Sequence, residues 1–480
     1  MSATTFYWHD YETLGADPRR DRAAQFAGIR TDADLNEIGE PLNLYCQPAP
    51  DFLPNPESVL ITGITPQLCL QRGLPEAGFI AAIHQQLAQP GTCGVGYNTI
   101  RFDDEFTRQL LYRNFYDPYA REWQNGCSRW DILDMLRLAR ALRPEGIAWP
   151  CHPDGKPSFR LEHLTQANGL AHEAAHDALS DVRATIAVAR LVKTCQPRLY
   201  DYVFQLRDKR KVAKLLNLQM PQPVLHVSGM FAAERGCLAL VLPLAHHPVN
   251  ANEVIVADLS ADPSPLFELD AAALRERLFT RSDALPVGAI RPPLKTIHLN
   301  KCPVVATASL LTDDVADRWQ IDRPLALQHA AMLVDHALHA KLAEVYTTPQ
   351  REPITDPDLL LYAGGFWSNR DKASLARIRQ SEPRALADGT FDFDDPRLPE
   401  MLFRYRARNF PHTLRPDEQQ RWQAYCRWRL TDPAGGASVV LDDYLAQLRA
   451  LADTSPAQPD LLVDLVDYGR GLLAEGFGER

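Results

Sequence analysis

Short apolar segments alternate with polar turns through the first part of the chain. Residues 5–13, 25–32 and 41–48 are rich in aromatic and apolar side chains, and Pro, Asp, Asn and Gly separate them, which predicts three successive strands. The stretch EAGFIAAIHQQLAQ then has helical spacing, and TCGVGYN predicts a compact strand that ends at Asn98. The later helical patterns complete an α/β domain that closes near Pro197, and they cover roughly 103–116, 128–143 and 177–195.

The pattern changes twice after this domain. From about residue 220 there are short β-like runs such as PVLHVSG, CLALVLPLA and NEVIVADLS, which predict a small β-rich domain. From about residue 350 apolar residues recur at helical spacing, after the Pro- and Asp-rich segment TTPQREPITDPDLL, which we interpret as a linker. We therefore expect three domains, with boundaries at 1–196, 197–347 and 352–480.

Composition narrows the class of protein without indicating its chemistry. Hydrophobic residues make up 45% and charged residues 23% of the 480 residues, which is ordinary for globular domains and excludes disordered and collagen-like classes. The first twenty residues lack the apolar stretch of a signal peptide, and the 9 cysteines form no C-x-x-C pair, so we expect a cytoplasmic protein with reduced thiols. The net charge of -10 argues against indiscriminate nucleic-acid binding, so any such groove must be made by clustered Arg and Lys.

Two acids interrupt the first predicted strand. Asp10 and Glu12 are two residues apart, so on a strand they face the same side, about 7 Å apart along the backbone. Paired carboxylates of this kind suit Mg²⁺ or Mn²⁺, which bind hard oxygen ligands. Two exposed acids on an edge strand are the simpler explanation for an isolated D-x-E pair.

Further acids follow at two other places. Asp103 comes just after the strand ending at Asn98 and opens a helix, so by itself it is better explained as a helix cap. In AAHDALSDVRATIAVARL, His176 precedes an amphipathic helix that contains Asp181. The two side chains converge only if His176 lies at or before the start of the helix, and otherwise it is a surface or capping residue.

Together these residues resemble the DEDD exonuclease superfamily in its histidine-bearing branch (DEDDh). The motifs N-x-x-x-F-D around Asp103 and H-D-A-x-x-D around Asp181 match that branch. Stretches along nearly the whole chain, among them YNTIRFDDEFTRQLLYRNFYDPY, SFRLEHLTQANG, LNKCPV and FRYRARNFPHTL, resemble the bacterial exodeoxyribonuclease I family. The resemblance implies an α/β ribonuclease-H-like exonuclease domain, followed by an SH3-like β-rich domain and a C-terminal helical domain.

The resemblance also implies the activity, which is Mg²⁺-dependent 3′-to-5′ digestion of single-stranded DNA to 5′-mononucleotides in DNA repair and recombination. Two Mg²⁺ ions, for which Mn²⁺ can substitute, are expected about 3.5 to 4 Å apart. Asp10 would bridge them, Glu12 and Asp181 would complete the first site, and Asp103 would serve the second, while His176 acts as general base. An exoribonuclease of the same superfamily and a non-catalytic DNA-binding scaffold are the competing interpretations.

Binding a single strand without sequence preference requires backbone cations beside aromatic faces. The segment 108–137 supplies both, and we expect the DNA path to include Arg108, Tyr119, Trp123 and Arg137, although aromatic residues at helical spacing are more often core. Arg160 is a candidate contact to the terminal phosphate. Arg404, Arg406 and Arg408 form a further basic run that either contacts DNA or pairs with local acids, and the family resemblance favours a helical domain that closes over the strand.

The family resemblance implies one protein partner besides DNA. This partner is the acidic C-terminal tail of the single-stranded-DNA-binding protein, for which Arg143 and Tyr202 are the candidate contacts. We expect a monomer. We also expect no association with membranes, because no run in the sequence reaches the roughly 18 apolar residues of a spanning helix.

Overall fold

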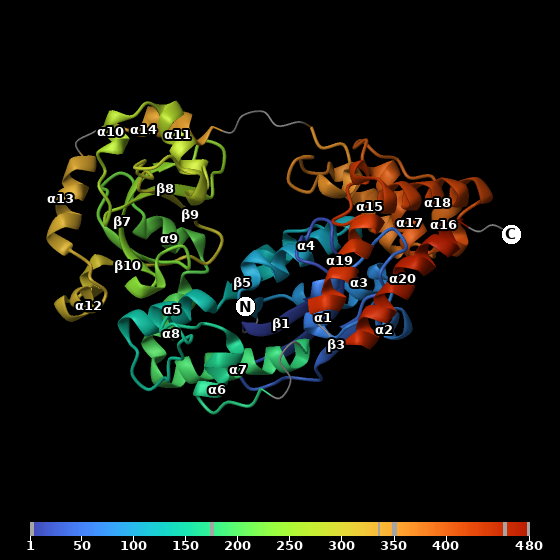
Figure 1. The fold of residues 1–480 in the computed structure, drawn as a ribbon, viewed down its shortest axis with the longest axis horizontal. Helices are drawn as coiled ribbons and strands as arrows, with labels where there is room; N and C mark the ends of the chain where they lie inside the picture. The colour runs from blue at the N-terminus through green and yellow to red at the C-terminus, as the bar shows by residue number, and fades with distance from the viewer. Residues whose placement is uncertain (1–3, 173–176, 335–336, 348–352, 455–457, 478–480) are drawn as a thin grey trace. The chain divides into compact units, whose positions relative to one another are not determined.

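The computed structural model describes residues 4–172, 177–334, 337–347, 353–454 and 458–477 (Figure 1). The chain forms two compact units, and its described strands form two five-stranded sheets. The first unit combines three separate stretches of chain, Met1–Ser128, His172–Thr185 and Glu352–Arg480. The second combines Arg129–Ala171 and Ile186–Arg351. In the described part of the chain, no helix has the length and apolar character needed to cross a bilayer.

The first sheet has the strand order β3-β2-β1-β4-β5. Strand β1 pairs antiparallel with β2 and parallel with β4, and β2 pairs antiparallel with β3. The predicted strands in the first hundred residues are therefore confirmed. Their bounds are β1 Thr5–Thr13, β2 Ala23–Thr31, β3 Leu42–Tyr45, β4 Thr92–Gly96 and β5 Ser128–Asp131.

Helices from both ends of the chain complete the first unit. Those from the N-terminal stretch are α1 Pro56–Thr62, α2 Pro66–Arg72, α3 Glu76–Leu87 and α4 Asp103–Arg113. The predicted C-terminal helical region is also confirmed, as α15 Asn369–Gln380, α16 Ala385–Asp388, α17 Leu398–Asn409, α18 Pro416–Thr431, α19 Leu441–Thr454 and α20 Pro459–Phe477. One hydrophobic cluster combines Ala24 of β2 and Val59 of α1 with Leu430, Tyr444 and Leu465 of the C-terminal helices, so these helices share a core with the strands and helices of the N-terminal stretch.

The second unit contains the predicted β-rich region. Its strands are antiparallel and have the order β10-β6-β7-β8-β9. They span β6 Val224–Val227, β7 Leu238–His246, β8 Glu253–Asp258, β9 Leu294–His298 and β10 Val304–Thr307. The helices before this sheet are α5 Leu133–Leu142, α6 Leu161–Ala167, α7 Ala178–Cys195 (whose first turns belong to the first unit), α8 Pro197–Gln205 and α9 Lys209–Leu215.

The sequence pattern was wrong in three details. Residues 128–131 form strand β5 and the helix α5 begins only at Leu133, because four residues are too few to distinguish a strand from a helical turn by periodicity. The predicted helix over 103–116 ends at Arg113. Helices that we did not predict lie within the β-rich region, namely α10 Pro265–Glu268, α11 Ala271–Phe279, α12 Asp313–Arg318, α13 Arg323–Val334 and α14 His339–Tyr346.

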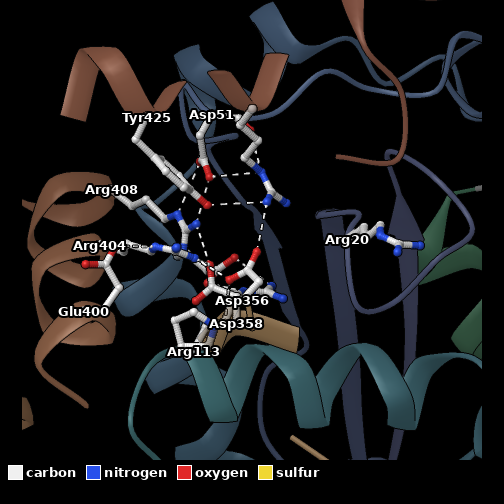
Figure 2. A network of polar contacts seen from close by, with 12 residues as sticks. Arg20, Asp51, Arg113, Asp356, Asp358, Glu400, Arg404, Arg408 and Tyr425 are labelled. Atoms are coloured by element: carbon white, nitrogen blue, oxygen red, sulfur yellow. Dashed lines mark hydrogen bonds and ion pairs between the residues drawn. The ribbon is translucent and has the colours of Figure 1, made fainter. Parts of the chain in front are cut away.

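A buried ionic network lies inside the first unit (Figure 2). Asp51, which is 0% exposed, follows β3 and accepts a hydrogen bond of 2.8 Å from Arg408 of α17. Arg408 also donates to Asp358 at 2.7 Å, and Arg404 donates to the same carboxylate at 3.0 Å. Arg429 of α18 donates to the backbone carbonyl of Asp51 at 3.2 Å. The network therefore connects the strand-rich part of the unit to its C-terminal helices.

These contacts decide between the two interpretations of the basic run at 404–408. Arg404 also pairs with Glu400 at 2.9 Å, and Arg406 pairs with Glu418 at 2.8 Å. Arg408 pairs with Asp51 and Asp358, which lie 357 and 50 residues earlier in the chain, so all three guanidinium groups are buried against acids that are partly local and partly distant. Pairing with acids is confirmed, and these arginines serve the packing of the helical region.

Candidate active site

Two acids of strand β1 lie at the centre of the candidate site. The spacing places the Asp10 and Glu12 side chains on the same side of the strand, where Asp10 is half-buried and Glu12 is 8% exposed. A carboxylate oxygen of each lies within 4.8 Å of the other and of a carboxylate oxygen of Asp181. Three oxygens at this separation can bind a common cation.

Asp103 reaches the same strand from the turn after β4. Gly96 at the end of β4 permits this approach, because a Cβ there would lie 2.0 Å from Thr99 Cγ2 and 2.8 Å from the carbonyl oxygen of His9. Asp103 is the first residue of α4 and does not cap that helix through its side chain. Its Oδ1 accepts the backbone N–H of Tyr11 at 3.0 Å, so the carboxylate lies beside the residue between Asp10 and Glu12.

The electrostatics of the cluster indicate crowded negative charge. Burial raises the pKa of Asp10 well above its ordinary value, and repulsion from Asp103, Glu12, Asp181 and Asp177 adds to it. The pKa of Glu12 rises to about 8, first through burial and then through repulsion from the same neighbouring carboxylates. A divalent cation would relieve both effects, so the donor set fits a hard metal ion such as Mg²⁺ or Mn²⁺.

Helix α7 brings Asp181 to the site from a distant part of the chain. The motif placed His176 just before this helix, but His176 lies outside the described residues. The histidine that the structure places against Asp181 is His172, whose Nε2 lies 2.5 Å from Asp181 Oδ1. Sequence reasoning missed this contact because nothing in the spacing of nine residues identifies it.

Two other residues near the site were also missed. Asp177 adds to the negative charge around Asp10 and Glu12. Gln25, which faces Glu12 in the register of β1 and β2, donates to Asp177 Oδ1 at 3.2 Å. Asp177 could have been found from the sequence, because it follows His176 directly in the H-D-A-x-x-D motif. Gln25 could be found only from the register of the strands.

The predicted DNA contacts of the first unit differ in exposure. Trp123 is 65% exposed, and Tyr119 is half-buried under the Arg108 guanidinium, 5.3 Å from its ring centre. Arg108 itself is only 5% exposed, and its Nε and Nη2 donate to the two carboxylate oxygens of Glu122, each at 2.8 Å. Glu105 also accepts from Arg108 at 2.8 Å. Trp123 is thus exposed to solvent, whereas Arg108 is buried in ion pairs.

The remaining predicted contacts belong to the second unit. Arg137 is half-buried and pairs with Asp134 at 2.5 Å, whereas Arg160 is exposed and lies 3.7 Å from Glu162. Of the residues predicted for the protein partner, Arg143 is exposed and Tyr202 is half-buried, with its hydroxyl donating to the carbonyl of Val305 at 2.7 Å.

Comparison with protein families covers the chain in three consecutive parts. The family described as Exonuclease matches residues 7–189, the Exonuclease I SH3-like domain matches 207–348, and the Exonuclease I C-terminal domain matches 355–472. Fold and site together define a nuclease that combines a ribonuclease-H-like exonuclease domain with SH3-like and C-terminal domains. The predicted fold class is confirmed.

Known relatives give the finer assignment. Exodeoxyribonuclease I of Escherichia coli strain K12 is 51% identical over 428 residues, which cover 88% of this chain and 89% of that protein. The structure of a moderately thermophilic exonuclease I from Methylocaldum szegediense is 55% identical with a TM-score of 0.93, over 98% of this chain and 100% of that one. The zinc-bound complex of E. coli exonuclease I with single-stranded DNA is 47% identical with a TM-score of 0.93, at the same coverage. The chain belongs to the exodeoxyribonuclease I family.

Proposed function

We propose that this chain digests single-stranded DNA from the 3′ end to 5′-mononucleotides, with Mg²⁺ as its metal, in DNA repair and recombination. The observation that carries the proposal is the approach of Asp10, Glu12 and Asp181 within 4.8 Å, with Asp103 beside them on the backbone of β1. The E. coli relative that was solved with zinc and single-stranded DNA supports the same assignment.

The four acids would hold two Mg²⁺ ions. Asp10 would be shared by both ions, Glu12 and Asp181 would complete the first site, and Asp103 would serve the second, partly through water. Two divalent cations supply stabilisation of the charge that develops on the attacking and leaving oxygens of a phosphodiester. The imidazole of His176 would accept the proton of the attacking water, since its ordinary pKa of about 6.5 lies close to working pH.

The remaining parts of the proposal concern binding. Exposed Trp123 and half-buried Tyr119 would stack on bases, and Arg108 and Arg137 would contact the backbone after exchanging a protein carboxylate for phosphate. Arg160 would contact the terminal phosphate. We further propose that the protein is a cytoplasmic monomer and that Arg143 and Tyr202 bind the acidic tail of the single-stranded-DNA-binding protein.

The test compares matched oligonucleotides labelled at either end. Metal-stripped protein should be inactive, and added Mg²⁺ should restore loss of the 3′ label from single-stranded DNA, more slowly from duplex DNA and RNA. Asp181→Asn should remain inactive, whereas Asp467→Asn, at an exposed position in α20, should match the wild type. Faster loss from RNA, or tight DNA binding with no hydrolysis after Mg²⁺ is restored, would contradict the proposal.

A further inference from the structure

Asp181 is a ligand of the proposed metal site, and its carboxylate is bound by the side chain of a histidine. The carboxylate only accepts, so the Nε2–H of His172 donates to Asp181 Oδ1, at 2.5 Å. The His172 side chain is 6% exposed and that of Asp181 is 16% exposed, so the bond is shielded from water. A carboxylate has about four acceptor positions on its two oxygens, so Asp181 can accept this hydrogen bond and bind a cation at the same time.

A second set of hydrogen bonds, made by Gln25 and Asp177, holds the start of helix α7. Gln25, which is 1% exposed, donates to Asp177 Oδ1 at 3.2 Å, and its own Oε1 accepts the N–H of Ala178 at 3.4 Å. Asp177 Oδ2 accepts the N–H of Ser180 at 3.1 Å, and its carbonyl accepts the N–H of Asp181 at 3.0 Å. Because Gln25 lies opposite Glu12 in the sheet, these bonds fix the backbone of Asp181 relative to β1.

With the backbone fixed in this way, the remaining freedom of Asp181 is rotation of its side chain. The Asp181 oxygen that lies within 4.8 Å of Asp10 and Glu12 keeps its place only when that rotation is restricted, and the hydrogen bond from His172 restricts it. Partners of this kind orient metal ligands, and their loss typically lowers metal affinity by about 10- to 100-fold.

We propose that His172 is a positioning residue, which orients the Asp181 carboxylate so that it completes the metal site with Asp10 and Glu12. The inference rests on the proposed function, since it takes these acids to be metal ligands. It is distinct from the role proposed for His176, because His172 acts through the carboxylate and not on the attacking water.

The length of the side chain substituted at residue 172 distinguishes a positioning role of His172 from a merely structural one. Gln reaches the position of the imidazole Nε2 with an amide N–H, whereas the shorter Asn does not and Ala removes the donor. We therefore expect His172→Gln to keep Mn²⁺ affinity within about threefold of the wild type, and His172→Asn and His172→Ala to weaken it by about 10- to 100-fold. His412→Ala, at an exposed position of the helical region, is the matched control and should bind as the wild type does.

Affinity is measured without DNA, by titrating the metal-free full-length protein with Mn²⁺ and following free Mn²⁺ by electron paramagnetic resonance. Urea unfolding in EDTA should give the same midpoint for each variant. If His172→Ala does not fold, the comparison of the Asn and Gln variants decides alone. Equal affinity of the Asn and Gln variants would overturn the proposal.

Turnover at saturating Mn²⁺ gives a second readout. A positioning role predicts that excess Mn²⁺ restores the kcat of His172→Asn, because the defect lies in metal occupancy. A kcat that stays low at full occupancy would overturn the proposal. Failure of the underlying metal site is recognised separately, because the wild type would then bind Mn²⁺ no better than Asp181→Asn.

Discussion

Asp51 is the residue on which the buried ionic network depends most directly. Its carboxylate is fully buried and accepts from Arg408, and Arg429 Nε lies 3.5 Å from it. Asp51→Asn keeps the shape of the side chain and removes its charge. Arg408 would retain Asp358 at 2.7 Å, and Arg429 would retain the carbonyl of residue 51 at 3.2 Å.

The expected cost follows from this partial loss. Removing one partner of a buried ion pair costs about 3 to 5 kcal/mol when the remaining charge is left unpaired. Arg408 keeps one of its two aspartates, so we expect the lower end, a decrease of about 3 kcal/mol in the free energy of unfolding. The same substitution at exposed Asp467 should change it by less than about 0.5 kcal/mol.

Urea unfolding at pH 7, followed by far-UV circular dichroism, measures both variants against the wild type. Tryptophan fluorescence provides a second probe, because Trp422 lies under the Arg408 guanidinium at 5.8 Å. If Asp51→Asn unfolds at the same urea concentration as Asp467→Asn, charge pairing at Asp51 does not hold the C-terminal helices in place, and the reasoning fails.

Three further predictions concern charge and catalysis. Burial would raise the pKa of Asp51, but the arginines around it, foremost Arg408, hold that pKa below its ordinary value. The charge of Asp51 therefore stabilises the folded state fully above about pH 4, and this stabilisation is lost as the pH falls further. The urea midpoints at about pH 7 and about pH 3.5 should accordingly differ less in Asp51→Asn than in the wild type. The pKa of Glu12 is raised to about 8, so its charge opposes folding increasingly from about pH 4.5 to pH 8; Glu12→Gln should raise the melting temperature of the metal-free protein at pH 8 while abolishing nuclease activity, and an unchanged or lower melting temperature would contradict this. His176→Ala should lower kcat by about 10²- to 10⁴-fold and leave Mn²⁺ affinity unchanged; a parallel loss of affinity would show that His176 supports the metal instead.

The sequence predicted those parts of the site that depend on local spacing. Asp10 and Glu12 share a face because a strand repeats every two residues, and this requires no knowledge of the rest of the fold. The position of Asp103 required the turn after β4, and sequence alone left its role between a cap and a ligand. His172 could not be predicted, because a separation of nine residues from Asp181 matches neither the strand nor the helix repeat.

Charge runs were informative only once their partners were known. Arg404 and Arg408 are basic in sequence, yet the aspartates that neutralise them lie some fifty to several hundred residues earlier in the chain. The pairing of Arg108 with Glu122 could not be predicted either, because the segment between them follows no regular repeat. Local patterns thus identified the β-rich and helical regions, while long-range ion pairs determined which arginines are buried.

The three separate stretches that make up the first unit have a consequence for biosynthesis. Leu14 and Phe52 are among the first core residues to leave the ribosome, but their partners Leu430 and Tyr444 are made several hundred residues later. At about 5 to 20 residues per second, the nascent nuclease region waits for tens of seconds with part of its apolar surface uncovered. The growing polypeptide therefore depends during that interval on chaperones or on transient contacts of its own, and nuclease activity should emerge only after translation has passed the last of these helices.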